Sequence, residues 1–472
     1  MLLHFFRRPS RERPTNEATM RRLGRRLSLT TAAVLAGGLF AANAGLGQST
    51  QGPINNNHCD FFEGVGLKSV LVPVDHSGTH SDRELTYFYQ AVENSTGTKN
   101  PKTVIYLTGG PGSGSIGTSG SGFLKKLRGV GLNLILIDPR GVACNGLKMG
   151  EVPDQVITTQ QTALDIVEVI KAEGLRDYIV MGHSYGTMLG TVLTSSINQM
   201  PSIEQPDLLV LEGIFSRHLA HGAEYMLNEI DVLRNEMPKH FPAVKELLFS
   251  GEDRPPPFDL PFEYWIHVLE GYTRLGVETF VLLNPAFTRF ADNYPDSLND
   301  QKIKADLDRD YKDYLEYWED TPPIKRKWIR EYAARNYVYF SIMCKEMSRQ
   351  DVGGFSKKMI DGQLSAVPNG SADVCDVFPF SDAPYDSKNY PISTPTLYFY
   401  GTSDGQTPKS YFVHHYDNSF ASKEVVSVAG GGHGLFGMDL EVCTSQIWAQ
   451  IADGRLDFTN ILDQDGYCLR PD

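Results

Sequence analysis

The sequence lacks the signatures of a zinc site, of a phosphate-binding loop and of a membrane-spanning core. Its six cysteines form no C-x-x-C pair, and none has a histidine nearby at zinc-ligand spacing. The glycine-rich segment 109–114 has neither a Lys-Ser/Thr ending nor G-x-G-x-x-G spacing. Beyond residue 44, no apolar run approaches the roughly 20 residues of a spanning helix. We therefore expect no bound metal and no stable membrane insertion of the mature chain.

Positive charge is also scarce. The 472 residues contain 44 Lys and Arg against 57 Asp and Glu, which gives a formal net charge of −13. The first 44 residues hold eight Arg and two Glu, a net +6, so the remainder carries −19. Such acidity argues against nucleic acid and anionic lipid as partners. A neutral or positively charged small substrate remains compatible. With 41% hydrophobic residues, the chain can form a sizeable core of one or two domains.

The first 44 residues have the layout of a signal peptide. Four arginines between residues 21 and 26 precede the apolar run Leu29–Ala42, and residues 42–44 form an A-x-A cleavage pattern. The pair Arg25-Arg26 suggests the twin-arginine route, with the Sec route as the alternative. Met20 is an alternative start to Met1. A single membrane anchor is the competing interpretation, but the run is too short for one. We expect a periplasmic or secreted protein, in which six cysteines suggest disulfides with fifteen possible pairings.

Buried strands alternate with helices in the first half of the chain and return near its end. The strand-like runs are continuous apolar stretches, as expected in a parallel sheet covered on both faces. This order predicts a doubly wound, mostly parallel α/β sheet. The expected strands are Ser69–Val74, Leu85–Val92, Thr103–Leu107, Leu132–Ile137, Tyr178–Met181, Leu208–Leu211, Thr396–Tyr400 and Glu424–Val428, and the expected helices are Thr162–Ala172, Thr187–Ile197 and Leu440–Ile451.

The alternation is interrupted between residues 216 and 392. This region is rich in aromatic and charged residues at helical spacing, notably in 223–234, 302–318 and 325–347. We therefore expect a signal peptide over 1–44, a core formed by 45–215 and 393–472, and a large helical cap over 216–392. The cap is inserted before the strand Thr396–Tyr400.

A candidate nucleophile lies where one of these strands turns into a helix. Tyr178–Met181 runs into Gly182-His183-Ser184-Tyr185-Gly186, which is G-x-S-x-G in a strand–turn–helix context. So sharp a turn needs flanking residues without a Cβ atom. The helix N-terminus places the backbone N–H of Tyr185 where an oxyanion would form. The motif predicts an α/β-hydrolase fold with Ser184 as nucleophile; a purely structural turn is the alternative.

Serine needs a base, and the base needs an orienting carboxylate. In the α/β-hydrolase fold the chain order is serine, acid, histidine. Asp404 follows the strand Thr396–Tyr400, and His433 follows Glu424–Val428 within a run of glycines. Each residue alone could be an ordinary loop residue. Their common place at consecutive strand ends predicts Asp404 as the acid and His433 as the base, whereas His183, His414 and His415 lack that setting.

The loop after Thr103–Leu107 is the candidate for the second oxyanion donor. Its sequence, Thr108-Gly109-Gly110-Pro111-Gly112, exposes backbone N–H groups at the same edge of the sheet. We expect the N–H groups of Gly110 and Tyr185 to form the oxyanion hole.

Together these motifs resemble the proline iminopeptidase and tripeptidyl aminopeptidase group of α/β-hydrolases, over about residues 59–470. Two departures border the oxyanion loop: Thr108 replaces the usual His of H-G-G-P-G, and Val142–Asn145 replaces the usual continuation of D-x-R-G. The matching segments are Gly109–Gly112, Asp138–Gly141, Gly182–Gly186, Leu211–Phe215 and, as in the larger secreted members, Val72–Asp75 and Cys375–Pro379.

The resemblance also implies roles that the residues alone do not. In this group acidic cap residues hold the free α-amino group of the substrate. Glu346 is the first candidate for that role and Glu319 the second, against the alternative of solvated helix faces. The resemblance further implies the disulfides Cys59–Cys144, Cys344–Cys375 and Cys443–Cys468.

These expectations describe an exported serine aminopeptidase that removes prolyl residues or tripeptides from free N-termini. It needs no metal or organic cofactor, and its partner is a peptide or small acyl substrate. An esterase, lactonase or amidase on the same scaffold is the first alternative. A non-catalytic binding protein is the second, and the intact Ser, His and Asp speak against it. Substrate length, proline preference and oligomeric state stay open.

Overall fold

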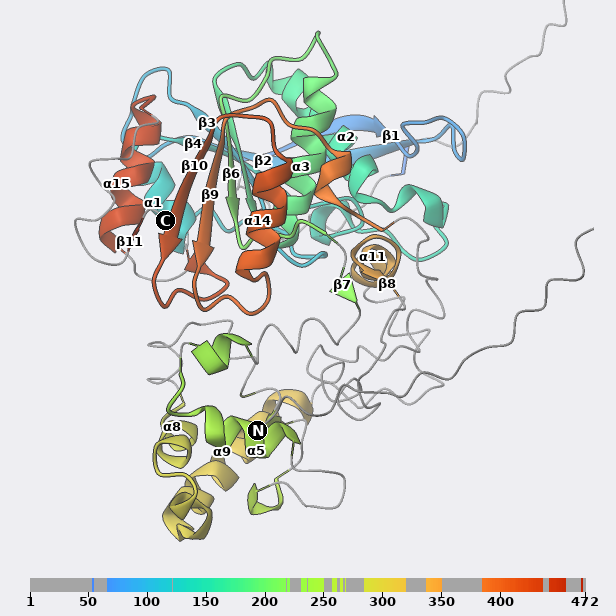
Figure 1. The fold of residues 1–472 in the computed structure, drawn as a ribbon. Coiled ribbons are helices and arrows are strands. Elements are labelled where there is room, and N and C mark those ends of the chain that lie inside the picture. Colours follow the sequence, from blue (N-terminus) through green and yellow to red (C-terminus); the bar gives the residue numbers. More distant parts are fainter. Residues whose placement is uncertain are drawn as a thin grey trace, which may run out of the picture. The chain divides into compact units, whose positions relative to one another are not determined.

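The structure is a computed structural model (Figure 1). It describes residues 53–54, 66–120, 122–217, 219–220, 231–235, 237–249, 257–260, 264–265, 268, 284–319, 337–349, 384–435, 441–455 and 468–469. The chain divides into a unit of residues 1–48 and a unit of residues 49–472. The expected signal peptide therefore lies outside the described residues and stays a prediction. No helix in the described part of the chain has both the length and the apolarity to cross a bilayer.

A nine-stranded sheet forms the centre of the described core. Its strand order is β1-β2-β4-β3-β5-β6-β9-β10-β11. The six strands from β4 to β10 run parallel, and β2 and β11 run antiparallel to their neighbours. The strands are β1 Leu67–Pro73, β2 Glu84–Val92, β3 Thr103–Leu107, β4 Asn133–Ile137, β5 Tyr178–His183, β6 Leu208–Glu212, β9 Thr396–Gly401, β10 Lys423–Val428 and β11 Cys468–Leu469.

This order, with a serine on the turn after β5, is that of the α/β-hydrolase fold. The predicted doubly wound, mostly parallel sheet is confirmed. A long insertion separates β6 from β9, at the place where the sequence predicts a helical cap before the acid-bearing strand. The predicted strands agree with the observed ones to within two residues at each end, because strands buried on both faces read as unbroken apolar runs.

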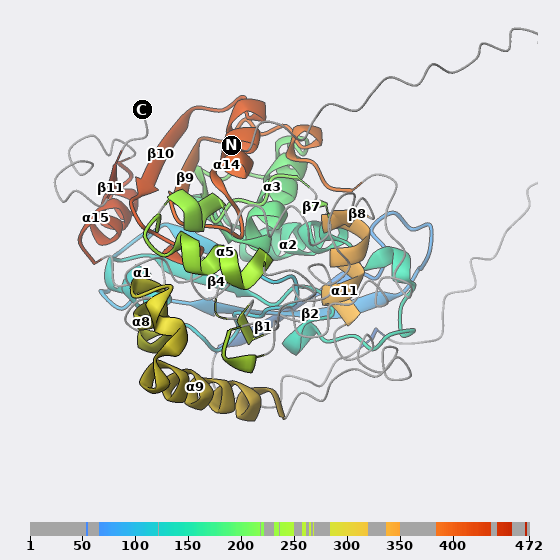
Figure 2. The ribbon, with the colours of Figure 1, turned by 60° about the horizontal axis from the view of Figure 1, so that its bottom comes forward.

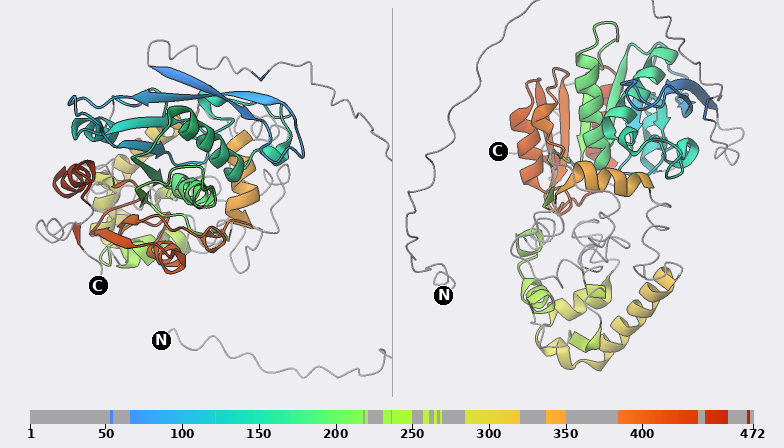
Figure 3. Two further views of the ribbon diagram at one scale, coloured as in Figure 1. Left: turned by 90° about the horizontal axis from the view of Figure 1, so that it is seen from above. Right: turned by 90° about the vertical axis from the view of Figure 1, so that its right-hand side faces the viewer.

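Helices cover both faces of the sheet (Figures 1 and 3). On one face, Leu127 and Trp448 pack in a cluster with strand residues such as Val210. On the other face, Ile166 and Leu189 belong to the larger cluster. The first face is covered by α1 Gly122–Gly129 and α15 Glu441–Ala452, and the second by α2 Thr159–Glu173, α3 Tyr185–Asn198 and α14 Lys409–Asn418.

The described helices of the insertion have a core of their own. Val244, Trp265, Phe290 and Leu307 belong to one buried cluster, in which Trp265 is fully buried. The cluster joins α5 Phe241–Phe249, α8 Pro285–Asp292 and α9 Gln301–Glu319. Helix α9 matches the predicted helix 302–318, whose apolar residues recur at helical spacing.

The last described part of the insertion packs on the hydrolase core instead. Helix α11 (Tyr337–Ile342) shares the cluster of α2 and α3, and Val338 Cγ2 lies 2.3 Å from where a Cβ on Gly141 would be. A π-helical turn, Met343–Met347, follows it. Strand β8 (Ser348–Arg349) then pairs with β7 (Leu219–Ala220), beside α11 in Figure 2. The predicted helix 325–347 is thus, in its described part, a short helix that ends in a wide turn.

Candidate active site

A serine on the turn between β5 and α3 is the first element of the candidate site. Ser184 has φ 53° and ψ −122°, a backbone conformation that residues with side chains rarely adopt. Two glycines permit the turn. A Cβ on Gly182 would lie 2.2 Å from the Gly186 carbonyl oxygen, and one on Gly186 would lie 2.1 Å from the Leu107 carbonyl oxygen. Any larger residue at either position would force the turn apart.

His433 and Asp404 meet beyond the ends of β10 and β9. His433 Nδ1 lies 2.9 Å from Asp404 Oδ2, and both residues are buried. The backbone N–H groups of Gln406 and Thr407 donate to Asp404 Oδ1 at 2.9 and 2.8 Å. The Thr407 hydroxyl donates to Asp404 Oδ2 at 2.7 Å and lies 3.1 Å from His433 Nδ1. A carboxylate held in this way keeps the proton of the imidazole on Nδ1 and leaves Nε2 available as a base.

The end of β6 links the serine to this pair. The backbone N–H of Ser184 donates to the Glu212 carbonyl oxygen at 2.9 Å. The next residue, Gly213, has φ +62°, and a Cβ there would lie 2.9 Å from His433 Cε1. No hydrogen bond joins Ser184 Oγ to His433 in the described structure. Such contacts in serine hydrolases often tighten only when substrate binds.

The loop after β3 lies against Ser184. A Cβ on Gly109 would lie 3.0 Å from Ser184 Cβ, so a larger residue here would crowd the serine. The Thr108 hydroxyl donates to the Ser113 carbonyl oxygen at 2.7 Å and ties the two ends of the loop together. The loop therefore borders the place where a substrate carbonyl bound to Ser184 would sit, and the Gly110 and Tyr185 donors stay a prediction.

A buried carboxylate anchors the far end of this loop. Asp138 Oδ1 accepts hydrogen bonds from the backbone N–H groups of Ser115 and Ile116 at 2.7 and 3.0 Å. Its Oδ2 accepts from the backbone N–H of Cys144 at 3.2 Å. Burial raises the pKa of the Asp138 carboxyl, while these three backbone donors lower it. The aspartate of the D-x-R-G motif is thus a structural anchor of the loop.

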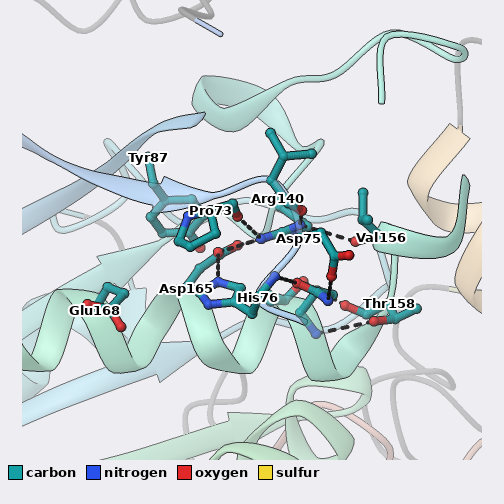
Figure 4. Close-up of polar contacts among 12 residues, drawn as sticks. Pro73, Asp75, His76, Tyr87, Arg140, Val156, Thr158, Asp165 and Glu168 are labelled. Carbon is teal, nitrogen blue, oxygen red and sulfur yellow. Dashed lines mark hydrogen bonds and ion pairs between the residues drawn. The ribbon is translucent and has the colours of Figure 1, made fainter. Parts of the chain in front are cut away.

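The arginine of the same motif has a different structural role. Arg140 is buried, and its Nε and Nη2 donate to the two oxygens of Asp165 on α2 (Figure 4). Its Nη1 donates to the carbonyl oxygen of Val74, and His76 Nε2 lies 2.8 Å from Asp165 Oδ1. Asp75 accepts several further hydrogen bonds, which outweigh burial and hold the pKa of its carboxyl well below the ordinary value. This network ties α2 to the segment after β1.

The structure describes the side chain of only one of the two candidate substrate carboxylates. Glu346, in the π-helical turn, accepts hydrogen bonds from the backbone N–H of Thr159 at the start of α2, at 3.0 and 3.3 Å. Burial raises the pKa of the Glu346 carboxyl, and the hydrogen bonds from Thr159 and the nearby Lys345 lower it. Its charge also contributes to raising the pKa of Tyr185, after burial. Glu319 is the last residue of α9, and its side chain lies outside the described residues.

Two of the six cysteines can be described in detail. Cys144 and Cys344 are fully buried, and neither is a free thiol: both are disulfide-bonded. Cys59 and Cys375, the partners that the family resemblance implies, lie outside the described residues, as do the side chains of Cys443 and Cys468. The three pairings therefore stay predictions. In the described part of the chain, no group of His, Cys, Asp and Glu could hold a metal ion.

Two features of the site are not predicted from the sequence. Thr407 contacts both Asp404 and His433, and its only sequence signal is a hydroxyl three residues after Asp404. His183, set aside on its position inside the turn, lies beside His433 with ring centroids 5.1 Å apart. Its partner Glu212 ends the strand before the insertion.

Comparison with known proteins gives only the likeness of fold. No protein-family model matches the chain, and no curated protein matches it. Among solved structures, a proline iminopeptidase from Mycobacterium smegmatis is 16% identical, with a TM-score of 0.39 over 82% of this chain and 98% of that one. A serine hydrolase from Cycloclasticus zankles is 14% identical, with a TM-score of 0.38 over 82% and 99%. An esterase from Exiguobacterium antarcticum is 13% identical, with a TM-score of 0.34 over 78% and 96%. Likeness at this level says nothing about the chemistry of the site.

Proposed function

We propose that the protein is a serine hydrolase that works by acyl transfer through Ser184, His433 and Asp404. The observation that supports this most is the meeting of a buried Asp404–His433 pair with the serine turn at the end of β6. In the proposed reaction Ser184 Oγ attacks a carbonyl carbon while His433 Nε2 takes its proton. Asp404 keeps the imidazole oriented and stabilises the imidazolium that forms.

The remaining steps follow from the same groups. Backbone N–H groups of Tyr185 and Gly110 stabilise the oxyanion of the tetrahedral intermediate, each by about 3 kcal/mol. His433 then protonates the leaving group, which departs and leaves an acyl-enzyme on Ser184. Water, deprotonated by His433, attacks the acyl carbon, and the acid product leaves as Ser184 regains its proton.

We further propose that the substrate is a peptide with a free N-terminus and that the chain is exported before it acts. The motif set of the proline iminopeptidase and tripeptidyl aminopeptidase group supports the first part. The leader of residues 1–44 and the disulfide-bonded state of Cys144 and Cys344 support the second. Glu346 is the proposed partner of the substrate ammonium, because an ammonium shielded from water needs a carboxylate.

One observation favours the esterase or amidase alternative. The Glu346 carboxylate already accepts two hydrogen bonds from the Thr159 N–H group, so it stabilises the first turn of α2. A carboxylate occupied in this way serves an incoming ammonium less well than an unoccupied one. The two proposals therefore differ in whether Glu346 acts on substrate or only on α2.

The deciding experiment compares substrates that differ only at the amino end. Hydrolysis is measured for a prolyl and a tripeptidyl chromogenic amide, for their N-acetylated forms and for a simple acyl ester. The proteins are wild type, Ser184→Ala, Glu346→Gln and the control Glu168→Gln, whose carboxylate pairs only with Lys171 at the surface of α2.

For an aminopeptidase, only the free-amine amides are cleaved, Ser184→Ala abolishes cleavage, and Glu346→Gln raises KM while Glu168→Gln changes nothing. Equal rates on blocked and free amides, or cleavage of the ester alone, would establish the alternative. Persistence of activity in Ser184→Ala would refute both.

A further inference from the structure

Two ionisable side chains beside the triad have no part in the mechanism above. His183 is the last residue of β5 and Glu212 the last of β6, and the two are register partners on these parallel strands. His183 Nδ1 lies 3.0 Å from Glu212 Oε2. The Glu212 side chain is only 2% exposed, whereas that of His183 is 24% exposed. A carboxylate buried this deeply needs a close partner, and His183 supplies one.

The His183 ring also lies beside His433 and the oxyanion loop. Its ring lies 5.1 Å from the ring of His433, centroid to centroid, with a tilt of 48°. Its Cδ2 also lies 3.3 Å from where a Cβ on Gly109 would be, beside the oxyanion loop. His183 therefore lies beside Glu212, His433 and the oxyanion loop at once.

The hydrogen bond to Asp404 alone does not fix His433. It restrains Nδ1, but the ring can still tilt about that contact, and Nε2 at the far end moves most. Gly213 limits the tilt from one side, because the ring lies so close that a Cβ on Gly213 would be 2.9 Å from Cε1 and 3.0 Å from Nδ1. A second contact, from a ring that is itself held in place, would fix the plane of the imidazole.

We propose that His183, held by Glu212, is a positioning residue that sets the plane of the His433 imidazole. This inference rests on the proposed hydrolase function and adds a second histidine–carboxylate pair to it. The charged and titratable groups described around the His433 ring are Asp404 from the loop after β9 and His183 from β5, with Glu212 from β6 paired to His183.

The test uses the rate at which a fluorophosphonate probe labels Ser184, measured from acid to neutral pH. The variants are His183→Ala, His183→Phe, Glu212→Gln and the double variant His183→Ala/Glu212→Gln. The matched control is His414→Phe, because His414 pairs with Asp386 at 2.9 Å in the same way but away from the site. Melting temperatures are recorded for every variant.

We expect His183→Ala to label about tenfold more slowly, since a small misplacement of a catalytic group costs this much or more. His183→Phe keeps a ring in contact with His433 and should recover part of the rate. Glu212→Gln removes the carboxylate that holds the His183 ring and should also slow labelling. The double variant should be no slower than the slower single one, and His414→Phe should behave as wild type.

The possible failures point to different conclusions. If wild type is not labelled at Ser184, the proposed hydrolase function is wrong. If wild type is labelled, and His183→Ala and Glu212→Gln keep its rate and pH profile, the positioning role is wrong. The proposed hydrolase function is then still supported. If His183→Ala does not fold, the isosteric Glu212→Gln and the ring-bearing His183→Phe decide the matter. A rate loss in Glu212→Gln with no rate loss in His183→Ala would also overturn the positioning role, because Glu212 would then act without His183.

Discussion

A buried histidine outside the active site should make the protein sensitive to acid. His415, on α14, is 2% exposed and lies between two hydroxyl groups. Its Nε2 is 2.9 Å from Thr191 Oγ1 on α3, and its Nδ1 is 2.9 Å from the Tyr398 hydroxyl on β9. Burial, with a smaller contribution from neighbouring His414, lowers the pKa of His415 from 6.5 to about 3. The folded protein therefore keeps this ring neutral.

The size of the effect follows from proton linkage. Between pH 6.5 and about 3, the unfolded chain binds a proton at His415 and the folded protein does not. The contribution of neutral His415 to the free energy of unfolding is therefore fully present above the pKa of this residue in the unfolded chain. It is lost as the pH falls below that pKa. The loss is about 1.4 kcal/mol for each pH unit, or roughly 3 kcal/mol on lowering the pH by about two units from 6.5.

The assay is urea unfolding of wild type and of His415→Gln at a series of pH values. The variant keeps a donor and an acceptor and cannot take up a proton. At neutral pH it should be less stable by about 1–3 kcal/mol, through imperfect hydrogen bonds. On lowering the pH by about two units from 6.5, wild type should lose roughly 3 kcal/mol more than the variant, so the gap closes or reverses. Titration of the carboxylates affects both proteins equally. A gap that stays constant from neutral to acid pH would refute the argument.

Three further substitutions test the supports of the site. Asp165→Asn leaves the buried Arg140 without its counter-charge and should lower the free energy of unfolding by about 3–5 kcal/mol in urea titrations. Gly213→Ala places a Cβ 2.9 Å from His433 Cε1 and should lower kcat about 10–100-fold with little change in KM, measured with the best substrate found. Thr108→Val removes the hydrogen bond that closes the oxyanion loop and should lower kcat more than it raises KM, while Thr108→Ser restores it.

Each of these predictions has a matched check. Asp453→Asn breaks an exposed pair with Arg455 and should cost at most about 1 kcal/mol, so an equal cost for Asp165→Asn would refute the importance of burial. An unchanged kcat in Gly213→Ala would mean that His433 can move away without loss. A Thr108→Ser variant as slow as Thr108→Val would assign the defect to packing instead of the hydroxyl.

Parts of the site depend on contacts that no single segment of sequence reveals. Helix α1, Gly122–Gly129, buries only Leu124 and Leu127, so its apolar signal is too short to stand out. The hydrogen bond between Glu346 and Thr159 joins positions 187 residues apart. Neither residue carries a local pattern that distinguishes a helix-stabilising carboxylate from a substrate ligand.

The sequence by itself determined the main strands of the sheet, the serine turn and the chain order of the proposed triad. Buried parallel strands are unbroken apolar runs, the turn at Ser184 tolerates only glycine at its crowded positions, and Asp404 and His433 each follow such a strand. Tertiary structure alone decided which side chains surround the triad. His183 meets Glu212 because β5 pairs with β6 in one particular register, and the same register brings Gly213 against His433. Register is set by how whole strands pack in the sheet, so these neighbours follow from the fold and from no local motif.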